Sequence, residues 1–573
     1  MTLPIPSITL VSIILLVALA ACDSGQGAVT DPPDDECSPD TADACEPPPV
    51  AACAPQQVPQ GRSCVRWTPA DGARLVNAAD TFDILVIDAG TEVRAAAGVR
   101  LVASQLHVNG TAAAPVRFLP LTEGVRWGGI ETPGYGADTS TIRYARIETA
   151  EHGVVATAPA LIENTHVKDV TGVGVVLHGG HLIRSVIEGA QDAGVAIGSN
   201  SHARLSDTDV RGSGDGIRVL CVRCRLFIGG GSIDNNAGDG VRTAFGDMRS
   251  GTVFFESPVR ITGNAGYPLV VPLTSMRGVM NEVAARNNLL GNGRDTVIAY
   301  AGSTWGAQYV PDAEGDLTIA RALPFRVTLP CLAALPLMTM EAGASLTVES
   351  YDCGGPWGAW PVPVSYGTPT EPVTITGINA MLGLVRQGAD TVFVRHARFT
   401  NVLLLSAETP VVMEDVELDS ASLVITAVGS RVTRLSSIGG GRTGAYEYQQ
   451  QAAITLAGDV RLAQVLIEGA LHHGLHIDGG SPVVSACTIR HNTGHGVWVE
   501  QGTVRIEQCS MEGNAGYGIH NSTPDTVQAP NNWWGDPTGP RGPTGNGVDG
   551  PVRYDPFLTA PPGHSAFVSA LHR

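Results

Sequence analysis

Short apolar runs alternate with glycine and asparagine turns along most of the chain, and the pattern repeats with a nearly constant period. Its clearest marker is a glycine followed by alternating apolar residues, which recurs at similar intervals in the middle of the chain and again near its end. Repetition at a period of about 22 residues is typical of a repeat architecture. The marker glycines are Gly153, Gly174, Gly194, Gly216, Gly240, Gly474, Gly496 and Gly518.

Two other positions keep a constant distance from the marker glycine. An asparagine stands at the fourth position before it in three units, at Asn236, Asn492 and Asn514. Each unit is therefore predicted to hold a short strand, a turn and another short strand, with Asn and Gly in the left-handed conformation that such turns require. An apolar residue stands at the seventh position before the marker at Val167, Ile187, Ile233, Ile467, Ile489 and Met511.

A unit of this length cannot bury its apolar side alone, so the units are expected to stack. Strands of successive coils would then pair in parallel, with alternate side chains pointing into a shared interior. The fold class predicted is all-β, a parallel β-helix solenoid of roughly 20 coils between Phe82 and Leu558. The Leu-x-x-Leu-x-Leu phrase of leucine-rich repeats and the Trp-Asp signals of propellers are both missing.

The pattern divides the chain into six parts. Residues 1–21 are predicted to be a lipoprotein signal peptide, and residues 22–80 a Pro- and Asp-rich tether with no core of its own, whose cysteines could close small loops. Two tandem β-helix segments follow at residues 81–300 and 338–560, joined by a junction at 301–337, and they could form one continuous helix. Residues 561–573 form a C-terminal tail.

The N-terminus indicates export. An apolar run from Ile8 to Ala21 is short for a membrane span but suits the core of a signal peptide. It ends in Leu19-Ala20-Ala21-Cys22, which resembles the bacterial lipobox and implies lipidation of Cys22 and anchoring to the cell envelope or surface. The start of the chain, from Met1 to Leu10, contains no Lys or Arg, unlike most signal peptides, so a cleaved soluble form and an uncleaved anchor remain alternatives.

The charge balance excludes one class of partner. The formal net charge is −19, Lys168 is the single lysine, and no basic cluster occurs. Nucleic acid requires clustered Lys and Arg, so no nucleic-acid partner is expected. The acidic excess fits a cationic partner or a divalent ion such as Ca²⁺, although solubility outside the cell explains it more simply. No cofactor is predicted.

Ten cysteines remain once Cys22 is set aside, an even number suited to an oxidising compartment. Four lie near the N-terminus, and the other six form three candidate disulfides. The close pair could be a disulfide or inert thiols. Each of the other two pairs is separated by one repeat length and would lie on adjacent coils, either as a disulfide or as stacked buried thiols. The N-terminal group is Cys37, Cys45, Cys53 and Cys64, and the pairs are Cys221 with Cys224, Cys331 with Cys353, and Cys487 with Cys509.

The end of the chain carries a family resemblance. The phrase from Asn531 through Trp533 and Trp534 to Pro540, with the later run from Tyr554 to Leu558, is similar to a closing phrase of the pectin-lyase-like superfamily, especially its bacterial surface lipoproteins. The resemblance implies a right-handed parallel β-helix over residues 80–560. The two tryptophans can cover the open apolar end, or they can offer a platform for stacking sugars.

The superfamily includes polysaccharide lyases, polygalacturonases and uronate epimerases, but no complete catalytic set of theirs is present. Of the polygalacturonase motifs only Gly494-His495-Gly496 matches, and it falls on the repeat marker, which favours a structural role. Asp34-Asp35 lies in the tether. No catalytic residue is predicted. The expected function is therefore a non-catalytic envelope protein for glycan contact, adhesion or structure; the alternative is a lyase or glycoside hydrolase acting on acidic polysaccharide.

A group of histidines is the remaining candidate for a ligand or metal site, because histidines from neighbouring turns can approach a common ion. No carboxylate is expected beside them in register. Asp215 and Asp239, each just before a marker glycine, form a weaker acidic candidate whose simpler role is in the turn. The histidines are His472, His473, His476, His491, His495 and His520.

Overall fold

A computed structural model gives the structure of the chain. It describes residues 53, 62–134, 139–198, 202–220, 224–243, 252–272, 275, 288–300, 317–319, 321, 324–330, 338–351, 360–361, 364–365, 367–384, 391–407, 409–441 and 451–563. The chain divides into a unit ending at Ala51 and a unit beginning at Ala52. The second unit holds all the described residues.

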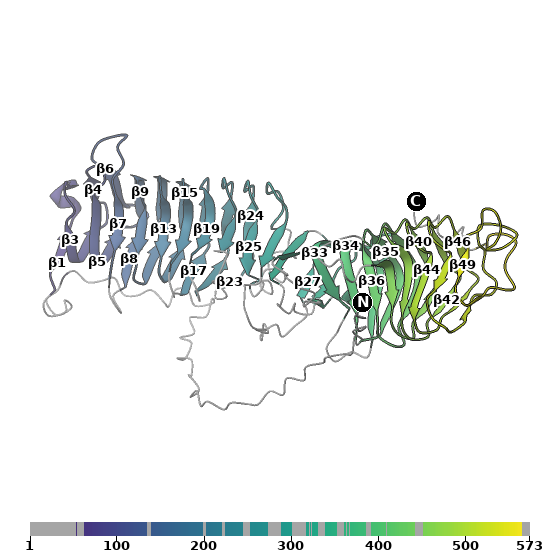
Figure 1. The fold of residues 1–573 in the computed structure, drawn as a ribbon. Helices are drawn as coiled ribbons and strands as arrows, with labels where there is room; N and C mark the ends of the chain where they lie inside the picture. Colours follow the sequence, from purple (N-terminus) through teal and green to yellow (C-terminus); the bar gives the residue numbers. More distant parts are fainter. Residues whose placement is uncertain are drawn as a thin grey trace, which may run out of the picture. The chain divides into compact units, whose positions relative to one another are not determined.

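The described strands form three sheets, of 38, 9 and 3 strands, and every pairing between named strands that they make is parallel (Figure 1). The one complete helical element in the described part is the 3-10 turn η2, Pro69–Asp71. No helix in that part is long and apolar enough to cross a membrane. The prediction of an all-β parallel solenoid is confirmed, with about 18 turns.

The strands of the first half follow the coils closely, and every third strand from β6 to β24 belongs to the nine-stranded sheet. They are β1 Cys64–Trp67, β2 Arg74–Val76, β3 Thr81–Asp88, β4 Glu92–Ala95, β5 Arg100–Asn109, β6 Val116–Pro120, β7 Gly129–Thr132, β8 Ser140–Arg143, β9 Ala145–Ala150, β10 Val154–Ala156, β11 Ala160–Glu163, β12 His166–Val170, β13 Val173–Leu177, β14 Gly180–Ile183, β15 Val186–Ala190, β16 Ala193–Ile197, β17 His202–Ser206, β18 Asp209–Arg211, β19 Asp215–Val219, β20 Arg225–Gly229, β21 Ser232–Asp234, β22 Val241–Thr243, β23 Thr252–Phe255, β24 Arg260–Thr262 and β25 Leu269–Pro272.

The second half begins with longer strands and ends with short ones. They are β26 Val297–Tyr300, β27 Leu317–Ile319, β28 Phe325–Pro330, β29 Met338–Met340, β30 Ser345–Tyr351, β31 Trp360–Pro361, β32 Val364–Ser365, β33 Val373–Gly383, β34 Val392–Ser406, β35 Val411–Asp419, β36 Ser422–Ile425, β37 Arg431–Ile438, β38 Ala452–Leu456, β39 Arg461–Ala463, β40 Leu466–Glu468, β41 His473–Asp478, β42 Val483–Ser485, β43 Thr488–Arg490, β44 Val497–Gln501, β45 Arg505–Glu507, β46 Ser510–Glu512, β47 Ile519–Asn521, β48 Val527–Gln528, β49 Val548–Asp549 and β50 Val552–Arg553.

The marker glycines are required by close packing between coils. A Cβ atom on Gly496 would lie 2.7 Å from the carbonyl oxygen of Gly518, and one on Gly216 would lie 2.5 Å from that of Gly240. Neither glycine has a positive φ. The side chain, rather than the backbone conformation, is therefore what these positions exclude.

The asparagines that keep step with the marker form buried ladders. Asn492 accepts a hydrogen bond from the backbone N–H of Ala470 at 2.9 Å, and Asn514 accepts one from the backbone N–H of Asn492 at 3.2 Å. The expected left-handed backbone at these asparagines is wrong; the residue before each carries it, as at His491 and Gly513. The asparagines are needed because backbone N–H groups sealed inside the turn require acceptors.

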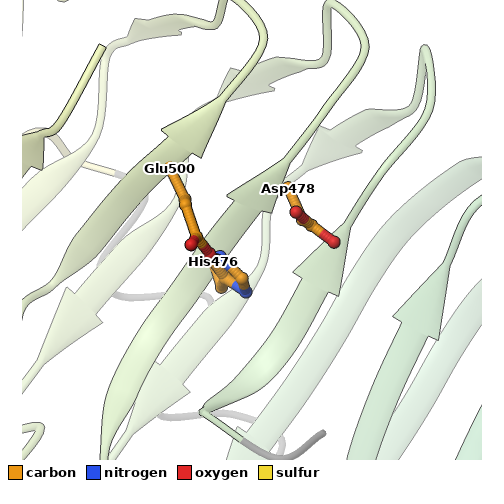
Figure 2. A group of neighbouring side chains, drawn as sticks. All are labelled: His476, Asp478 and Glu500. Carbon is orange, nitrogen blue, oxygen red and sulfur yellow. Dashed lines mark hydrogen bonds and ion pairs between the residues drawn. The ribbon is translucent and has the colours of Figure 1, made fainter. Parts of the chain in front are cut away.

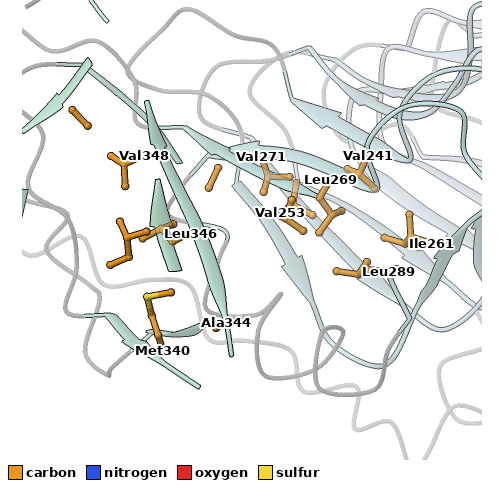
Figure 3. Packing of buried hydrophobic residues seen from close by; sticks show 14 of the residues in the cluster. Val241, Val253, Ile261, Leu269, Val271, Leu289, Met340, Ala344, Leu346 and Val348 are labelled. Carbon is orange, nitrogen blue, oxygen red and sulfur yellow. The ribbon is translucent and has the colours of Figure 1, made fainter. Parts of the chain in front are cut away.

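The two predicted segments share one hydrogen-bonded ladder. β25 pairs with β26, and the pairing continues through β28, β30 and β33 to β34. Buried side chains on both sides of this stretch belong to a single core cluster, as Figure 3 shows for Leu269, Val271, Leu346 and Val348. The predicted junction therefore contributes strands to a continuous sheet.

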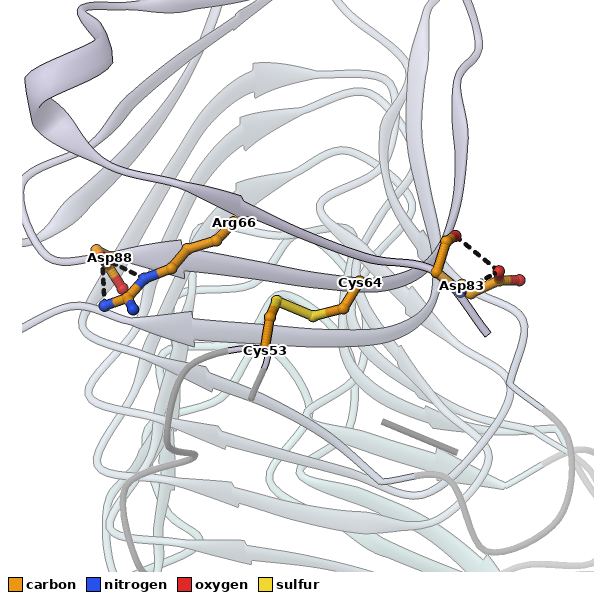
Figure 4. The surroundings of a disulfide bond; sticks show 6 residues. Cys53, Cys64, Arg66, Asp83 and Asp88 are labelled. Carbon is orange, nitrogen blue, oxygen red and sulfur yellow. Dashed lines mark hydrogen bonds and ion pairs between the residues drawn. A yellow bond between two sulfur atoms is a disulfide. The ribbon is translucent and has the colours of Figure 1, made fainter. Parts of the chain in front are cut away.

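The β-helix begins earlier than predicted. β1 pairs in parallel with β3, and β2 with β4, so residues 64–80 belong to the first coil rather than to the tether. The spacing marker is missing there, which hid the coil. A disulfide between Cys53 and Cys64 closes a small loop at the start of β1 (Figure 4), as expected for the N-terminal cysteines. Cys22, Cys37 and Cys45 lie outside the described residues.

The pair at Cys487 and Cys509 occupies equivalent places on adjacent coils, as predicted, directly before β43 and β46. Both sulfurs are free thiols, and the backbone N–H of Cys487 points to the Cys509 sulfur at 3.3 Å. Burial raises the pKa of the Cys509 thiol. The stacked thiols, and not the disulfide, are thus the form present. Cys224 is disulfide-bonded, whereas Cys221, Cys331 and Cys353 lie outside the described residues.

The closing tryptophans act as a cap. Trp534 is fully buried in the core cluster, and its ring meets the Tyr554 ring edge-on at 6.4 Å between centroids. Trp533 is 7% exposed and its indole N–H donates to Glu512 at 3.2 Å. The alternative of a sugar platform is wrong, because neither ring presents a free face. The cap keeps the apolar end of the last coils away from water.

Candidate functional site

A histidine at the start of β41 and another just before β44 have a structural role. The Nδ1 atom of His473 accepts a hydrogen bond from the backbone N–H of His495 at 2.9 Å, and Nδ1 of His495 accepts one from Tyr517 at 3.0 Å. A Cβ atom on Gly494 would lie 2.6 Å from His473 Nδ1. The Gly494-His495-Gly496 motif therefore results from the coil geometry, as expected.

The acidic pair of the first half has the same role. Oδ1 of Asp215 accepts a hydrogen bond from the backbone N–H of Asp239 at 3.0 Å, and Oδ1 of Asp239 accepts one from Tyr267 at 2.8 Å. Each side chain thus satisfies a backbone donor of the next coil. Asp215 and Asp239 serve the turn, and each also pairs with an arginine, Arg218 and Arg242 respectively.

The histidines of successive late coils form part of a surface that we call the aromatic strip. One column runs through His473, His495 and Tyr517, with centroid distances of 4.9 and 5.5 Å between successive stacked rings. Rings from β41, β44 and β47 lie beside this column, because strand pairing sets them in register. The members of the aromatic strip are His473, His476, His495, Trp498, Tyr517 and His520.

The strip is tightly packed but open on its outer side. His476 stacks on Trp498 at 4.5 Å, and His495 stacks on His520 at 4.7 Å. Tyr517 is 42% exposed, whereas His476 is buried under the neighbouring rings. Flat rings held in this way lose little conformational entropy when a second flat surface packs against them.

Electrostatics favours the neutral form of two imidazoles in the strip, those of His473 and His495. Burial, followed by the charges of His495 and its neighbours, lowers the pKa of His473 to about 4. Burial and then His520 also lower the pKa of His495. A neutral ring with Nδ1 acting as acceptor carries its proton on Nε2, so His473 and His495 add N–H donors to the edges of the stacked rings.

Polar groups border the strip at one end. Asp549 lies 2.7 Å from Nδ1 of His520, and Ser522 lies 3.1 Å from Nε2 of the same ring. The indole N–H of Trp498 donates to Ser522 at 3.2 Å. These contacts fix the ring orientations, so the strip is organised before any ligand arrives.

A second group shares His476 with the strip and adds two carboxylates, those of Asp478 and Glu500 (Figure 2). Nε2 of His476 is 3.0 Å from a Glu500 carboxylate oxygen, and one ligand atom from each residue lies within 4.8 Å of the other two. Burial, and to a smaller degree Glu500, raise the pKa of Asp478, while His476 opposes this.

The expectation that no carboxylate accompanies the histidines is therefore wrong. Asp478 and Glu500 stand one repeat length apart in the sequence, and this spacing was the available signal. A β-bulge between Ile477 and Asp478 shifts the register and pairs Asp478 with Gln501. Bulges redirect side chains and occur often beside functional sites.

Two of the six candidate histidines do not join the strip. His491 lies 3.3 Å from Glu468, and His472 is exposed. Among the described residues, neither makes a ring contact with the strip. The other four histidines, His473, His476, His495 and His520, are brought together as the shared turns predicted.

Comparison with protein families agrees with this geometry. The family described as "Right handed beta helix region" matches residues 423–533, from β36 to the closing tryptophans. The chain is a right-handed parallel β-helix protein. A search of curated proteins finds no match. The matched part of the β-helix contains all of the aromatic strip, and the fold is compatible with a generic polysaccharide-interacting or enzyme-like β-helix protein.

Proposed function

We propose that this β-helix protein binds a neutral polysaccharide on the aromatic strip without cleaving it. The observation that carries the proposal is the set of stacked rings on three successive coils. The outer edges of the stacked rings offer apolar contact to sugar rings, while sugar hydroxyl groups can use the nearby N–H donors and carboxylates. A ladder of rings fits a chain molecule better than a single small ligand.

The charge around the strip indicates the type of polysaccharide. Glu500 and Asp549 each contact a ring of the strip and are 44% and 47% exposed at their side chains. Exposed carboxylates repel uronate groups and accept hydrogen bonds from hydroxyl groups. We therefore place neutral glycans ahead of acidic ones as ligands.

The cellular setting is also part of the proposal. The lipobox-like phrase ending at Cys22 and the Pro-rich tether would hold the β-helix at the cell envelope, where polysaccharides are plentiful. Labelling with a radioactive fatty acid tests this, because a C22A variant should lose the label.

Binding can be measured by co-sedimentation of the purified full chain with insoluble or cross-linked neutral and acidic polysaccharides. We expect W498A to weaken binding by about tenfold, which corresponds to about 1.4 kcal/mol of lost stacking. The control is F254A, which removes an exposed ring that stacks on Phe227 outside the strip. Equal binding by W498A and the unchanged chain would contradict the proposal.

The same samples should be assayed for reducing ends and for unsaturated uronate. We expect neither product. Product formation that is lost in E500Q and D478N would instead assign these carboxylates to acid–base catalysis and support the alternative of a hydrolase or lyase.

A further inference from the structure

The group formed by His476, Asp478 and Glu500 has the composition of a metal site. It combines one imidazole nitrogen with two carboxylates, and its ligand atoms lie within 4.8 Å of one another. At a side-chain exposure of 9%, His476 is held against Trp498 and directs Nε2 towards Glu500. An imidazole fixed by stacking needs little reorganisation to become a ligand.

The two carboxylates of this group have no arginine partner among the described residues. Within the described part of the chain, the Asp478 carboxylate has no hydrogen bond or ion pair, whereas most of the other inter-coil carboxylates face an arginine, as Glu468 faces Arg490 at 2.9 Å. Within the described residues, the contact that links two members of the group is the one between His476 and Glu500. Two carboxylates beside one imidazole give the group a negative charge that a bound divalent ion would offset.

The β-bulge shows how the group is built. Without the extra residue in β44, Glu500 would pair with Asp478 along the ladder; with it, Gln501 takes that place and Glu500 lies 3.0 Å from His476. The bulge interrupts the hydrogen-bonded ladder between β41 and β44. In return, one imidazole and two carboxylates lie close together.

We propose that His476, Asp478 and Glu500 bind a divalent transition-metal ion of the Zn²⁺ or Mn²⁺ class. Imidazole nitrogen selects against Ca²⁺, which takes oxygen ligands, while two carboxylates and one nitrogen suit Zn²⁺ and Mn²⁺. Three protein ligands leave at least one coordination position for water or another ligand. Glu500 is 44% exposed, so the ion has access from solvent.

The test is calorimetric titration of the purified full chain with ZnCl₂ and, separately, with MnCl₂ after treatment with a chelator. We expect E500Q and D478N each to weaken binding of one ion by tenfold or more, since each replaces a charged carboxylate ligand with a neutral amide of the same size. The same stoichiometry and affinity in both variants and in the unchanged chain would overturn the proposal.

The matched control is E468Q. Glu468 also contacts a histidine of the next coil, His491, at 3.3 Å. Within the described residues, it is not part of a group of three possible metal ligands. We expect E468Q to bind the ion as the unchanged chain does. If E468Q weakened ion binding as much as E500Q does, the weaker binding would result from the lower surface charge and not from a lost ligand.

A second readout separates coordination from folding. Co²⁺ substituted at the site should give visible absorption bands that are absent in E500Q, while thermal unfolding shows whether the variant remains folded. Ca²⁺ in excess should leave the bands in place; their disappearance on adding Ca²⁺ would contradict the nitrogen-containing site. The outcome does not depend on polysaccharide binding, so the two proposals can fail separately.

Discussion

The coils around Arg218 and the coils around Trp498 share one backbone frame but present different outer surfaces. Arg218 and Trp498 occupy the same place after a marker glycine, on β19 and β44. Arg218 bonds to Asp215 at 2.9 Å and to Asp192 at 2.8 Å, so its charge is neutralised within the surface. Trp498 instead stacks on His476.

The comparison separates the positions that make the fold from those free to carry function. Buried apolar residues, the marker glycine and the ladder asparagine recur in both regions. The outer positions before and after the glycine do not. In the first region they form ion pairs, and in the second they form a stack of rings bordered by exposed carboxylates.

The largest expected effect is on the shared frame. G496V places a branched side chain where a Cβ atom alone would lie 2.7 Å from a carbonyl oxygen of the next coil. We expect it to lower the free energy of unfolding by about 3 kcal/mol or more. The control G563A enters open space, and both can be compared by thermal unfolding. A similar small change in the two variants would contradict the close-packing role.

The asparagine ladders should be equally important in both regions. N236A and N492A each leave a buried backbone N–H without its acceptor, those of Ser213 and Ala470. We expect each variant to lose about 2 kcal/mol of stability. Denaturant unfolding measures the change. A large loss of stability in only one of the two variants would show that the ladders are not equally important in the two regions.

Acid should distinguish the regions. The pKa of His473 is about 4 in the fold, against an ordinary value of 6.5, because burial opposes the charged ring. The unfolded chain binds the proton first, so the stability from His473 is complete above about pH 6.5 and falls as the pH drops towards 4. The protection of backbone amides from hydrogen exchange, relative to their intrinsic rates, should therefore fall more between pH 7 and 5 in residues 452–521 than in residues 202–243.

The matched variant is H473N, whose side-chain oxygen can still accept from the backbone N–H of His495, as Asp215 does for Asp239. We expect this variant to lose the part of the pH response that belongs to His473. An unchanged response in H473N would assign it elsewhere.

The smallest effect is expected at the ion pairs of the first region. R218A removes contacts of a partly exposed side chain with Asp192 and Asp215. We expect a loss of about 0.5 kcal/mol, reduced further by salt, as measured by denaturant unfolding in low and high salt. A loss as large as that of N236A would mean that the outer surface also supports the frame.

The repeat in the sequence predicted the interior well, because side-chain alternation and coil length determine which residues face inward. Ile187 and Ile489, which hold the same place before a marker glycine, are completely buried. The first coil was missed because it lacks the marker, and the Asp478–Glu500 group because its direction depends on one extra residue. The lipid at Cys22 remains a prediction.

The ladder asparagines also show how this architecture tolerates change. Asn492 and Asn514 are 22 residues apart, Asn236 and Asn264 are 28 apart, and Asn514 and Asn546 are 32 apart, yet each pair makes the same contact. Extra residues are therefore absorbed at the periphery while the register is kept. For an evolving lineage or a protein engineer, the peripheral loops between ladder asparagines are separate insertion sites, and new loops can be tried there one coil at a time without redesigning the interior.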